Sequence, residues 1–188
     1  MSTQPAVRGW TYEEFANLPD DGNRYEVIAG ELYVTPPPET PHQEASARFF
    51  MELRGFATND HALGLVLYAP VAVLFGDGDY LEPDIIFLSD ARKHFRTRRG
   101  IEGPPDLVVE VLSRSTARHD RGLKRERYAH FGVPEYWIID PDRGAVEVYD
   151  LQRDAEHATV VTDRLRWTPV EGGPVLDLNV RALLSGLE

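Results

Sequence analysis

The stretch PPDLVVEVLSRST, residues 104–116, decides how we interpret the fold. Its centre, DLVVEVL, is rich in valine and leucine, which is typical of a strand in the middle of a sheet that is covered on both faces. One acidic residue, Glu110, stands between Val109 and Val111, four residues after Asp106. Ionised carboxylates are rarely buried without a partner, so the stretch predicts a positive group nearby: a lysine, an arginine or a metal ion.

The position of Glu110 within this strand also has a functional meaning. Residues two apart on a strand point to the same face, so Asp106, Val108, Glu110 and Leu112 share one face and the residues between them share the other. Glu110 lies near the C-terminal end of the strand, where open α/β sheets usually bind their ligands. We therefore interpret Glu110 as a candidate site residue and Asp106 as a residue of the strand entry.

Before this strand, the sequence predicts short elements joined by turns. Thr11 and Glu14 have the spacing of a capping box, which predicts a short helix through about Leu18. The other predicted elements are a β-hairpin from RYEVI and ELYVT (24–35), an amphipathic helix from His42 to about Phe56, one long strand at 63–75 interrupted by Ala69-Pro70, and a short strand in EPDIIFL beginning at Asp84.

After the strand, Ser115 or Thr116 is expected to cap a helix from about Ala117 to Phe131. VPEYWIID (133–140) and AVEVYDL (145–151) form a second predicted hairpin, followed by HATVVT (157–162), VLDLNV (175–180) and a helical turn at RALL (181–184). This order predicts one α/β domain over residues 1–188: a mixed β-sheet flanked by helices, with an N-terminal β-hairpin.

Composition and charge narrow the function classes. The net charge of -11 argues against general affinity for nucleic acid, which depends on lysine and arginine. Residues 92–127, however, hold 11 Lys and Arg against 5 Asp and Glu, so this segment carries +6 and the remainder -17. The segment is either a docking zone for a polyanion or a solvated arginine-rich surface. The absence of cysteine excludes disulfides and thiolate metal sites.

Targeting signals are also missing from the sequence. The first residues, MSTQPAVRGWTYEEF, have no apolar signal core, and no run approaches the roughly 20 apolar residues that a membrane-spanning helix needs. We expect a cytoplasmic protein with no membrane partner.

Three chemical groups in the sequence form a candidate catalytic set. Asp84 begins the strand before the central one, so if the two strands are neighbours, Asp84 and Glu110 can converge on one divalent ion such as Mg²⁺. Asp120, Lys124 and Tyr128 follow at i, i+4 and i+8, on one face of the predicted helix. Lys124 can then reach the carboxylates, keep them ionised and stabilise the charge that develops on a phosphate during hydrolysis.

These segments together resemble the Uma family of candidate restriction endonucleases, within the PD-(D/E)XK nuclease superfamily. The likeness rests on PDLVVEVLSRST, on Asp120, Lys124 and Tyr128, and on GVPEYWIIDP (132–141). It extends to RYEVIAGELYV with the proline loop and His42, to EPDIIF, and to GGPVLDLNVRALL (172–184). The resemblance thus covers nearly the whole chain.

The resemblance implies a restriction-endonuclease-like core, a homodimer, and a DNA substrate cleaved with Mg²⁺ or Mn²⁺ held by Asp84 and Glu110. The superfamily pattern places a lysine two residues after the glutamate, but this sequence has Leu112 there. The family moves the lysine to the following helix, which assigns its catalytic role to Lys124. Asp120 and Tyr128 then support Lys124, and Arg114 replaces a proline that is common in the family.

Two N-terminal residues, His42 and Glu26, match family positions that we place at the rim of the site. Each has a simpler interpretation: His42 as a residue that begins a helix, and Glu26 as an exposed hairpin residue paired with Arg24 or Lys93. The whole chain also has two alternatives to catalysis. One is an inactive nuclease fold that binds nucleic acid or a protein partner, and the other is a structural homodimer.

Overall fold

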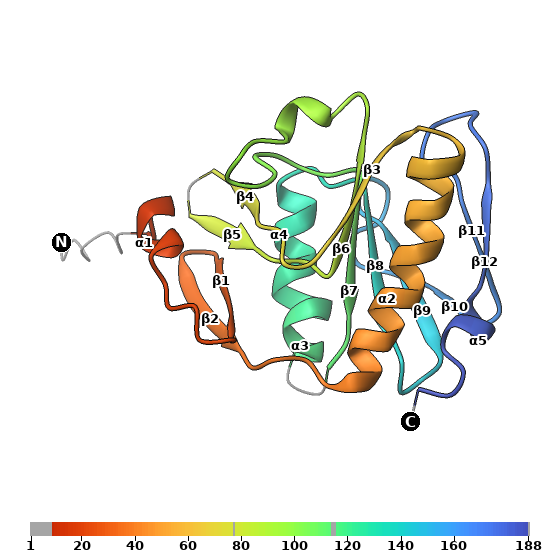
Figure 1. Cartoon of the computed structure of the whole chain (residues 1–188), viewed down its shortest axis with the longest axis horizontal. Helices are drawn as coiled ribbons and strands as arrows, with labels where there is room; N and C mark the ends of the chain where they lie inside the picture. Colours follow the sequence, from red (N-terminus) through yellow and green to blue (C-terminus); the bar gives the residue numbers. More distant parts are fainter. Residues whose placement is uncertain (1–8, 77, 114–115, 188) are drawn as a thin grey trace.

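The computed structural model describes residues 9–76, 78–113 and 116–187, and a six-stranded mixed sheet forms its centre (Figure 1). The strand order is β10-β9-β8-β7-β6-β3, in which β7 and β8 are parallel and the other pairs are antiparallel. The strands are β3 (Gly64–Tyr68), β6 (Ile85–Ser89), β7 (Leu107–Val111), β8 (Glu135–Asp140), β9 (Ala145–Asp150) and β10 (Thr159–Val161).

The strand that opened the sequence analysis is β7, and helices cover both of its faces as predicted. Leu107, Val109 and Val111 pack into the core beneath α2 (Thr40–Arg54), which continues into the π-helical turn Gly55–Asp60. Val108 and Leu112 pack into the opposite core, beneath α3 and α4. Figure 1 shows the sheet between these two layers. β7 is apolar on both faces except for Glu110, which is its one charged residue.

The second helical layer is one irregular helix. It consists of α3 (Ala117–His119), the π-helical turn Asp120–Lys124 and α4 (Arg125–His130). Thr116 precedes the first helical residue, but its side chain does not cap the helix, and both Ser115 and Arg114 lie outside the described residues. The remaining helical elements are α1 (Tyr12–Ala16), the 3-10 turn Lys93–Phe95 and α5 (Val180–Leu183). None of the helices within the described ranges is long and apolar enough to cross a membrane.

The predicted N-terminal hairpin belongs to a second sheet with the order β2-β1-β5-β4. Its strands are β1 (Arg24–Ile28), β2 (Glu31–Thr35), β5 (Asp79–Leu81) and β4 (Val73–Phe75). Ala29 and Gly30 both have positive φ, 53° and 81°, which is the conformation of a two-residue hairpin turn. A two-stranded ribbon of β11 (Arg164–Trp167) and β12 (Leu176–Asn179) completes the fold beside α5.

Residues 63–75 differ from the prediction. They form two strands in two sheets, because Pro70 has no amide hydrogen for a ladder and the chain leaves β3 before it reaches β4. β3 and β4 each lie at the edge of their sheet, where a neighbouring proline is tolerated. β5 and β11 were not predicted, and VLDLNV, which contains β12, was not assigned to a strand. All three are short, and β5 directly follows a turn.

Candidate active site

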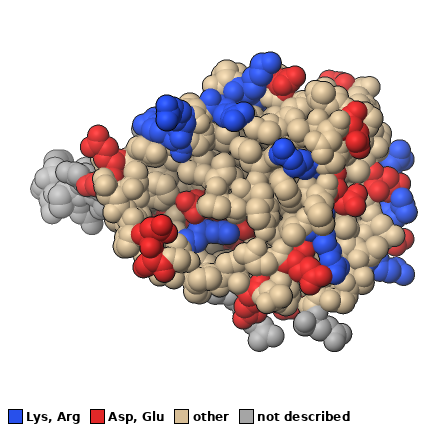
Figure 2. Space-filling view, in the orientation of Figure 1, with Lys and Arg blue, Asp and Glu red and all other residues tan. Residues whose placement is uncertain are grey.

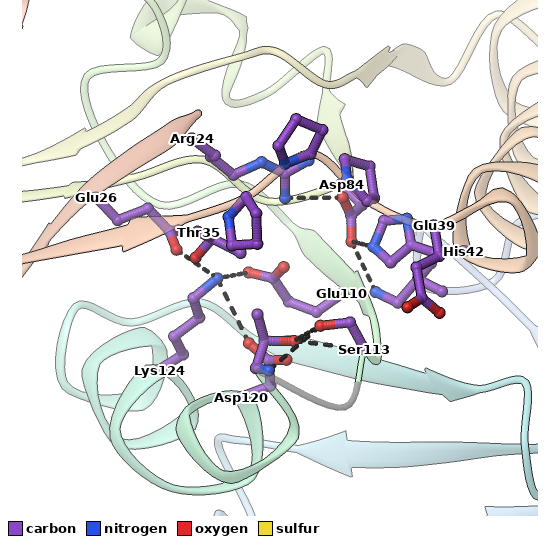
Figure 3. Close-up of a pocket in the computed structure, with 15 residues that line it drawn as sticks. Arg24, Glu26, Thr35, Glu39, His42, Asp84, Glu110, Ser113, Asp120 and Lys124 are labelled. Carbon is purple, nitrogen blue, oxygen red and sulfur yellow. Dashed lines mark hydrogen bonds and ion pairs between the residues drawn. The ribbon is translucent and has the colours of Figure 1, made fainter. Parts of the chain in front are cut away.

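A pocket of about 270 Å³ opens where three parts of the fold meet: the sheet β2-β1-β5-β4, which we call the hairpin sheet, the start of α2, and the π-helical turn Asp120–Lys124 (Figure 3). Prolines 36–38, which connect β2 to α2, form one wall. The other walls carry charged side chains from five segments that are far apart in the sequence. We call this hollow the acid pocket; its charged and titratable lining consists of Arg24, Glu26, Glu39, His42, Asp84, Glu110, Asp120 and Lys124.

Lys124 is the buried cation of the acid pocket. Its Nζ lies 2.9 Å from Glu26 Oε2, 3.0 Å from Glu110 Oε1 and 3.5 Å from Asp120 Oδ1. Burial opposes a charge on Lys124, but Glu110, Glu26 and Asp120 outweigh that effect and raise the pKa of the ammonium well above its ordinary value. Lys124 is therefore a fixed positive charge at neutral pH, and it answers the question of what neutralises Glu110.

The π-helical turn Asp120–Lys124 sets the direction in which the Lys124 side chain points. Asp120 and Lys124 are the first and last residues of this turn, and both are buried against the sheet. The turn is anchored because Tyr136 OH donates a hydrogen bond to the carbonyl of Asp120, at 3.1 Å. One turn later, Tyr128 OH donates to Glu110 Oε1 at 2.9 Å. Short π-helical segments are frequent at functional sites, and this one presents two charged groups to the same pocket.

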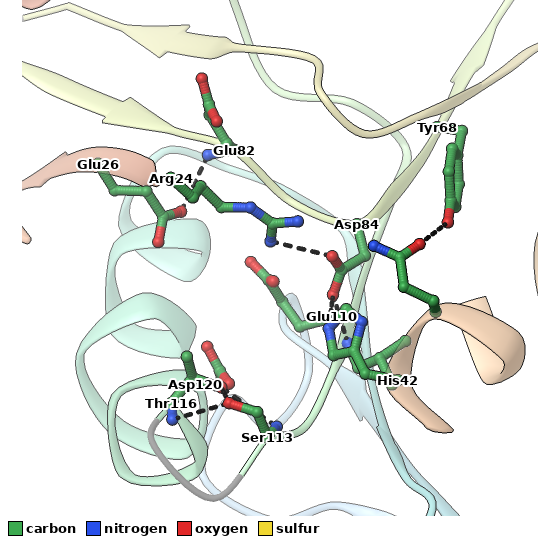
Figure 4. A network of polar contacts seen from close by, with 12 residues as sticks. Arg24, Glu26, His42, Tyr68, Glu82, Asp84, Glu110, Ser113, Thr116 and Asp120 are labelled. Atoms are coloured by element: carbon green, nitrogen blue, oxygen red, sulfur yellow. Dashed lines mark hydrogen bonds and ion pairs between the residues drawn. The ribbon is translucent and has the colours of Figure 1, made fainter. Parts of the chain in front are cut away.

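Asp84 is held from three sides (Figure 4). The Val111 amide donates to Oδ2 at 2.8 Å, His42 Nε2 lies 3.1 Å from the same oxygen, and Arg24 Nη1 lies 2.9 Å from Oδ1. Burial resists ionisation of Asp84, but the hydrogen bond and charge of His42, the charge of Arg24 and the Val111 amide together lower its pKa to about 2. Asp84 is therefore a carboxylate at neutral pH.

The pKa values of Glu110 and Asp120 shift in the opposite direction, upward. Burial raises the pKa of Glu110 well above its ordinary value, and the nearby acids Asp120, Asp84 and Glu26 add to the rise despite Lys124. Burial likewise raises the pKa of Asp120. Among the residues that the structure describes, four buried acids share two permanent cations, Arg24 and Lys124, so the pocket has an excess of acidic groups.

This excess fits a divalent cation, which the chemistry of the oxygen donors also favours. Asp120 Oδ1 is buried without a hydrogen bond to any described residue and has the longest of the contacts to Lys124, 3.5 Å, while Lys124 and Tyr128 both contact Glu110 through Oε1. The same part of the chain holds no group of three or more His, Asp or Glu side chains arranged around a single point. Such a site would consist of a carboxylate pair completed by water, as is usual for Mg²⁺.

The structure brings every predicted site residue to this pocket or to its wall. Glu26 is 3 % exposed and contacts Lys124, so the alternative of an exposed hairpin residue is wrong. His42 is both a residue of the first turn of α2 and a partner of Asp84. Asp106 lies elsewhere, where it accepts a hydrogen bond from the Ser89 amide at 2.7 Å, as its assignment to the strand entry predicted.

Two charged residues of the pocket, Arg24 and Glu39, were not predicted as part of the site. Arg24 was considered only as a partner of Glu26, whereas its guanidinium binds Asp84. A signal was present in the sequence: Arg24 and Glu26 are two apart on β1 and therefore share a face. If Glu26 lines the pocket, Arg24 lines it as well. What the sequence did not show is that this face meets the start of β6.

Comparison with known proteins agrees with the fold. A family model described as "Putative restriction endonuclease", Uma2, matches residues 12–181. Among solved structures, a protein from Anabaena variabilis described as "a putative nuclease belonging to DUF820" aligns with a TM-score of 0.78 and 22% identity, over 95% of this chain and 99% of that one, which shows the same fold. No curated protein matches the chain. Because the family model spans most of the sequence, the chain belongs to the Uma2 family of nucleases.

Proposed function

We propose that the chain is a metal-dependent endonuclease of the PD-(D/E)XK type that hydrolyses phosphodiester bonds in DNA. The observation that carries the proposal is the acid pocket itself: a buried lysine in contact with Glu110, beside an ionised Asp84, in a cluster with more negative than positive charge. Strongly perturbed charged groups that converge in a pocket are typical of catalytic sites.

In this proposal, Asp84 and Glu110 hold Mg²⁺ or Mn²⁺. A bound divalent ion supplies a Lewis acid and lowers the pKa of a water molecule. The protein groups have separate tasks. His42 and the Val111 amide fix the carboxylate of Asp84, and Tyr128 fixes that of Glu110.

Lys124 acts as a cation in this proposal, because its raised pKa keeps the proton on Nζ and excludes it as a general base at neutral pH. It orients the attacking water or stabilises the negative charge that develops on the phosphate. Glu26 and Asp120 hold the ammonium in place from two sides. Of the seven side chains in these roles, six are less than 4 % exposed and His42 is 8 % exposed, which limits the motion of the cluster.

The decisive experiment is incubation of the purified protein with plasmid, single-stranded DNA and RNA, with Mg²⁺, with Mn²⁺ or with a chelator. We expect nicking of DNA that requires metal and falls about a hundredfold or more in Lys124→Ala, since removal of one transition-state contact typically has that effect. Arg153→Ala is the control, because the Arg153 side chain is 88 % exposed and does not line the acid pocket. No cleavage of any substrate by the wild type would contradict the proposal.

A second candidate is a catalytically inactive nuclease fold that binds nucleic acid or a protein partner. The specific observation in its favour is that Arg24 already occupies Asp84 Oδ1, where a metal ion would bind. Calorimetric titration with Mn²⁺ separates the candidates. Binding that is lost in the Asp84→Ala, Glu110→Ala double variant supports the nuclease, and identical titrations of variant and wild type support the inactive fold. The homodimer stays a prediction, which light scattering on the purified protein tests.

A further inference from the structure

Two more hollows continue the acid pocket along the molecule. The first, of about 490 Å³, shares Arg24 and Asp84 with the acid pocket and extends to Pro70; we call it the middle hollow. The second, of about 270 Å³, shares Pro70 with the middle hollow and ends at residues 96–101. Figure 2 shows charged side chains recessed in the lower centre of this face and basic side chains gathered above them, toward the upper left. Each hollow shares lining residues with the next, and we call the three together the track.

The far end of the track carries uncommitted positive charge. It belongs to the basic loop, which we define as residues 92–99. Arg96 and Arg98 are exposed, and neither guanidinium has a hydrogen bond or ion pair with any residue that the structure describes. Arg99, in contrast, is bound to Glu102 at 2.8 Å. Free guanidinium groups are well suited to phosphate oxygens, which they bind in a planar, two-pronged geometry.

Gly100 and Ile101, which directly follow the basic loop, hold its end against the hairpin sheet. The Ile101 amide donates to the Ala72 carbonyl at 2.9 Å, and the Leu74 amide donates to the Ile101 carbonyl at 2.7 Å. Gly100 has a φ of 143°, and a Cβ at this position would lie only 2.3 Å from the Ala72 carbonyl oxygen. Because the chain packs this closely, Arg96 and Arg98 are presented from a fixed backbone beside Pro70.

The middle hollow has a different chemistry. Three partly exposed aromatic rings line it, those of Phe15, Tyr25 and Tyr68. The acids Asp20 and Glu82 line it as well, so it disfavours phosphate groups. Tyr68 is oriented by a hydrogen bond from its OH to Gln43 Oε1 at 3.0 Å and by Phe50, whose ring centroid lies 5.2 Å away. Fixed aromatic rings are the usual stacking surfaces for the bases of a single strand.

We propose that a single nucleic-acid strand follows this track, with a base stacked on Tyr68 and a backbone phosphate bound by Arg96 and Arg98. The inference rests on the proposed nuclease function, because the scissile phosphate would lie in the acid pocket. A single strand fits because its bases are exposed and can enter the middle hollow. A duplex presents phosphates on its outside, which Asp20 and Glu82 would repel.

The test is binding of a fluorescently labelled DNA strand of about ten nucleotides, measured by anisotropy in chelator so that no cleavage occurs. We expect Arg96→Ala with Arg98→Ala to weaken binding and to reduce the slope of log K against log salt by about 0.7, the contribution of the one phosphate contact that the two arginines share. Tyr68→Ala should weaken binding about five- to a hundredfold at any salt concentration, whereas Tyr68→Phe keeps the ring and the affinity.

Arg153→Ala with Arg166→Ala is the matched control, because both arginines are exposed on the β9 and β11 side of the molecule. Wild-type affinity in the Arg96, Arg98 variant, or an equal loss in the control, would overturn the track. If a duplex binds more tightly than the single strand, and the same variants weaken its binding, the occupant of the track is not a single strand. If the wild type binds the strand but does not cleave it in Mg²⁺, the proposed function is wrong and the track is not. If the wild type cleaves DNA but the Arg96, Arg98 variant binds the strand as tightly as the wild type, the track is wrong and the proposed function is not.

Discussion

Two charged clusters extend from the π-helical turn Asp120–Lys124, and they differ in their balance of charge. In the outer cluster, Arg121 Nη2 lies 2.7 Å from Asp140 Oδ2 and 2.7 Å from Glu147 Oε1. Arg143 adds a contact of 3.4 Å to Glu147. Two arginines thus face two carboxylates, and the acids have partners on the protein itself.

The acid pocket is unbalanced by comparison. Its described residues set two permanent cations against four buried acids, and Asp120 Oδ1 has a 3.5 Å ion pair with Lys124 but no hydrogen bond to the described residues. A balanced cluster holds elements of the fold together, because removal of either sign would leave a buried charge unpaired. An unbalanced cluster that faces a pocket remains able to bind a cation. The four predictions below change one member of one cluster at a time.

The largest effect is expected for Lys124→Met, which removes the charge that three buried carboxylates share. Breaking a buried ion pair typically costs about 3–5 kcal/mol, so the free energy of unfolding should fall by that amount in urea denaturation with chelator. Lys93→Met, at an exposed lysine, should leave it unchanged. A similar small change in both variants would show that the acid pocket does not depend on Lys124.

Arg24→Ala should produce two effects of opposite sign. Without metal, the variant should unfold about 1–2 kcal/mol more easily, because Asp84 is buried and loses a charged partner. With metal, the freed Oδ1 of Asp84 should bind Mn²⁺ more tightly than in the wild type, as measured by calorimetry. Weaker Mn²⁺ binding would mean that Arg24 helps to form the metal site and does not compete for it.

Arg121→Met tests the balanced cluster. Its guanidinium is 34% exposed and Arg143 remains beside Glu147, so solvent and this neighbour limit the loss to about 1 kcal/mol. Cleavage should stay within about tenfold of the wild type, because a structural cluster supplies no group to the transition state. If the DNA-nicking assay shows a loss as large as that of Lys124→Ala, the two clusters act as one unit.

The smallest change is expected for Glu110→Gln, and it is a gain in stability. Burial raises the pKa of Glu110 in the folded protein above its usual 4.5, so the folded state favours the protonated carboxyl. Its contribution to the free energy of unfolding is therefore complete below about pH 4.5 and is lost as the pH rises. Asp84, whose pKa is lowered to about 2, loses its contribution only below about pH 4, outside this window.

In chelator at neutral pH, Glu110→Gln should therefore unfold about 0.5–1 kcal/mol less easily than the wild type, with less dependence on pH above 4.5. The same variant should lose Mn²⁺ binding and cleavage. Thermal melts across pH 5 to 8 measure the first effect, and calorimetry measures the second. A variant less stable than the wild type at neutral pH would show that Lys124 needs the charge of Glu110.

Much of the fold could be predicted from short segments of the sequence. The run of valine and leucine around Glu110 placed β7 in the centre of a covered sheet, and Ala29-Gly30 predicted the first hairpin, because these signals depend only on residues a few positions apart. The spacing of Asp120, Lys124 and Tyr128 likewise placed three groups on one side of a helix. The split of residues 63–75 was not predicted, since apolar periodicity shows that a segment is a strand but not which sheet it joins.

The sequence by itself determined which residues of the site are chemically unusual: an acid within an apolar strand, an acid that begins the preceding strand, and a lysine one helix later. The tertiary structure alone decided their partners. Arg24 meets Asp84, and Glu26 is buried against Lys124, only because the hairpin sheet packs beside the end of β7. Charge interactions act over a few ångströms between segments far apart in the chain, so no local pattern specifies them.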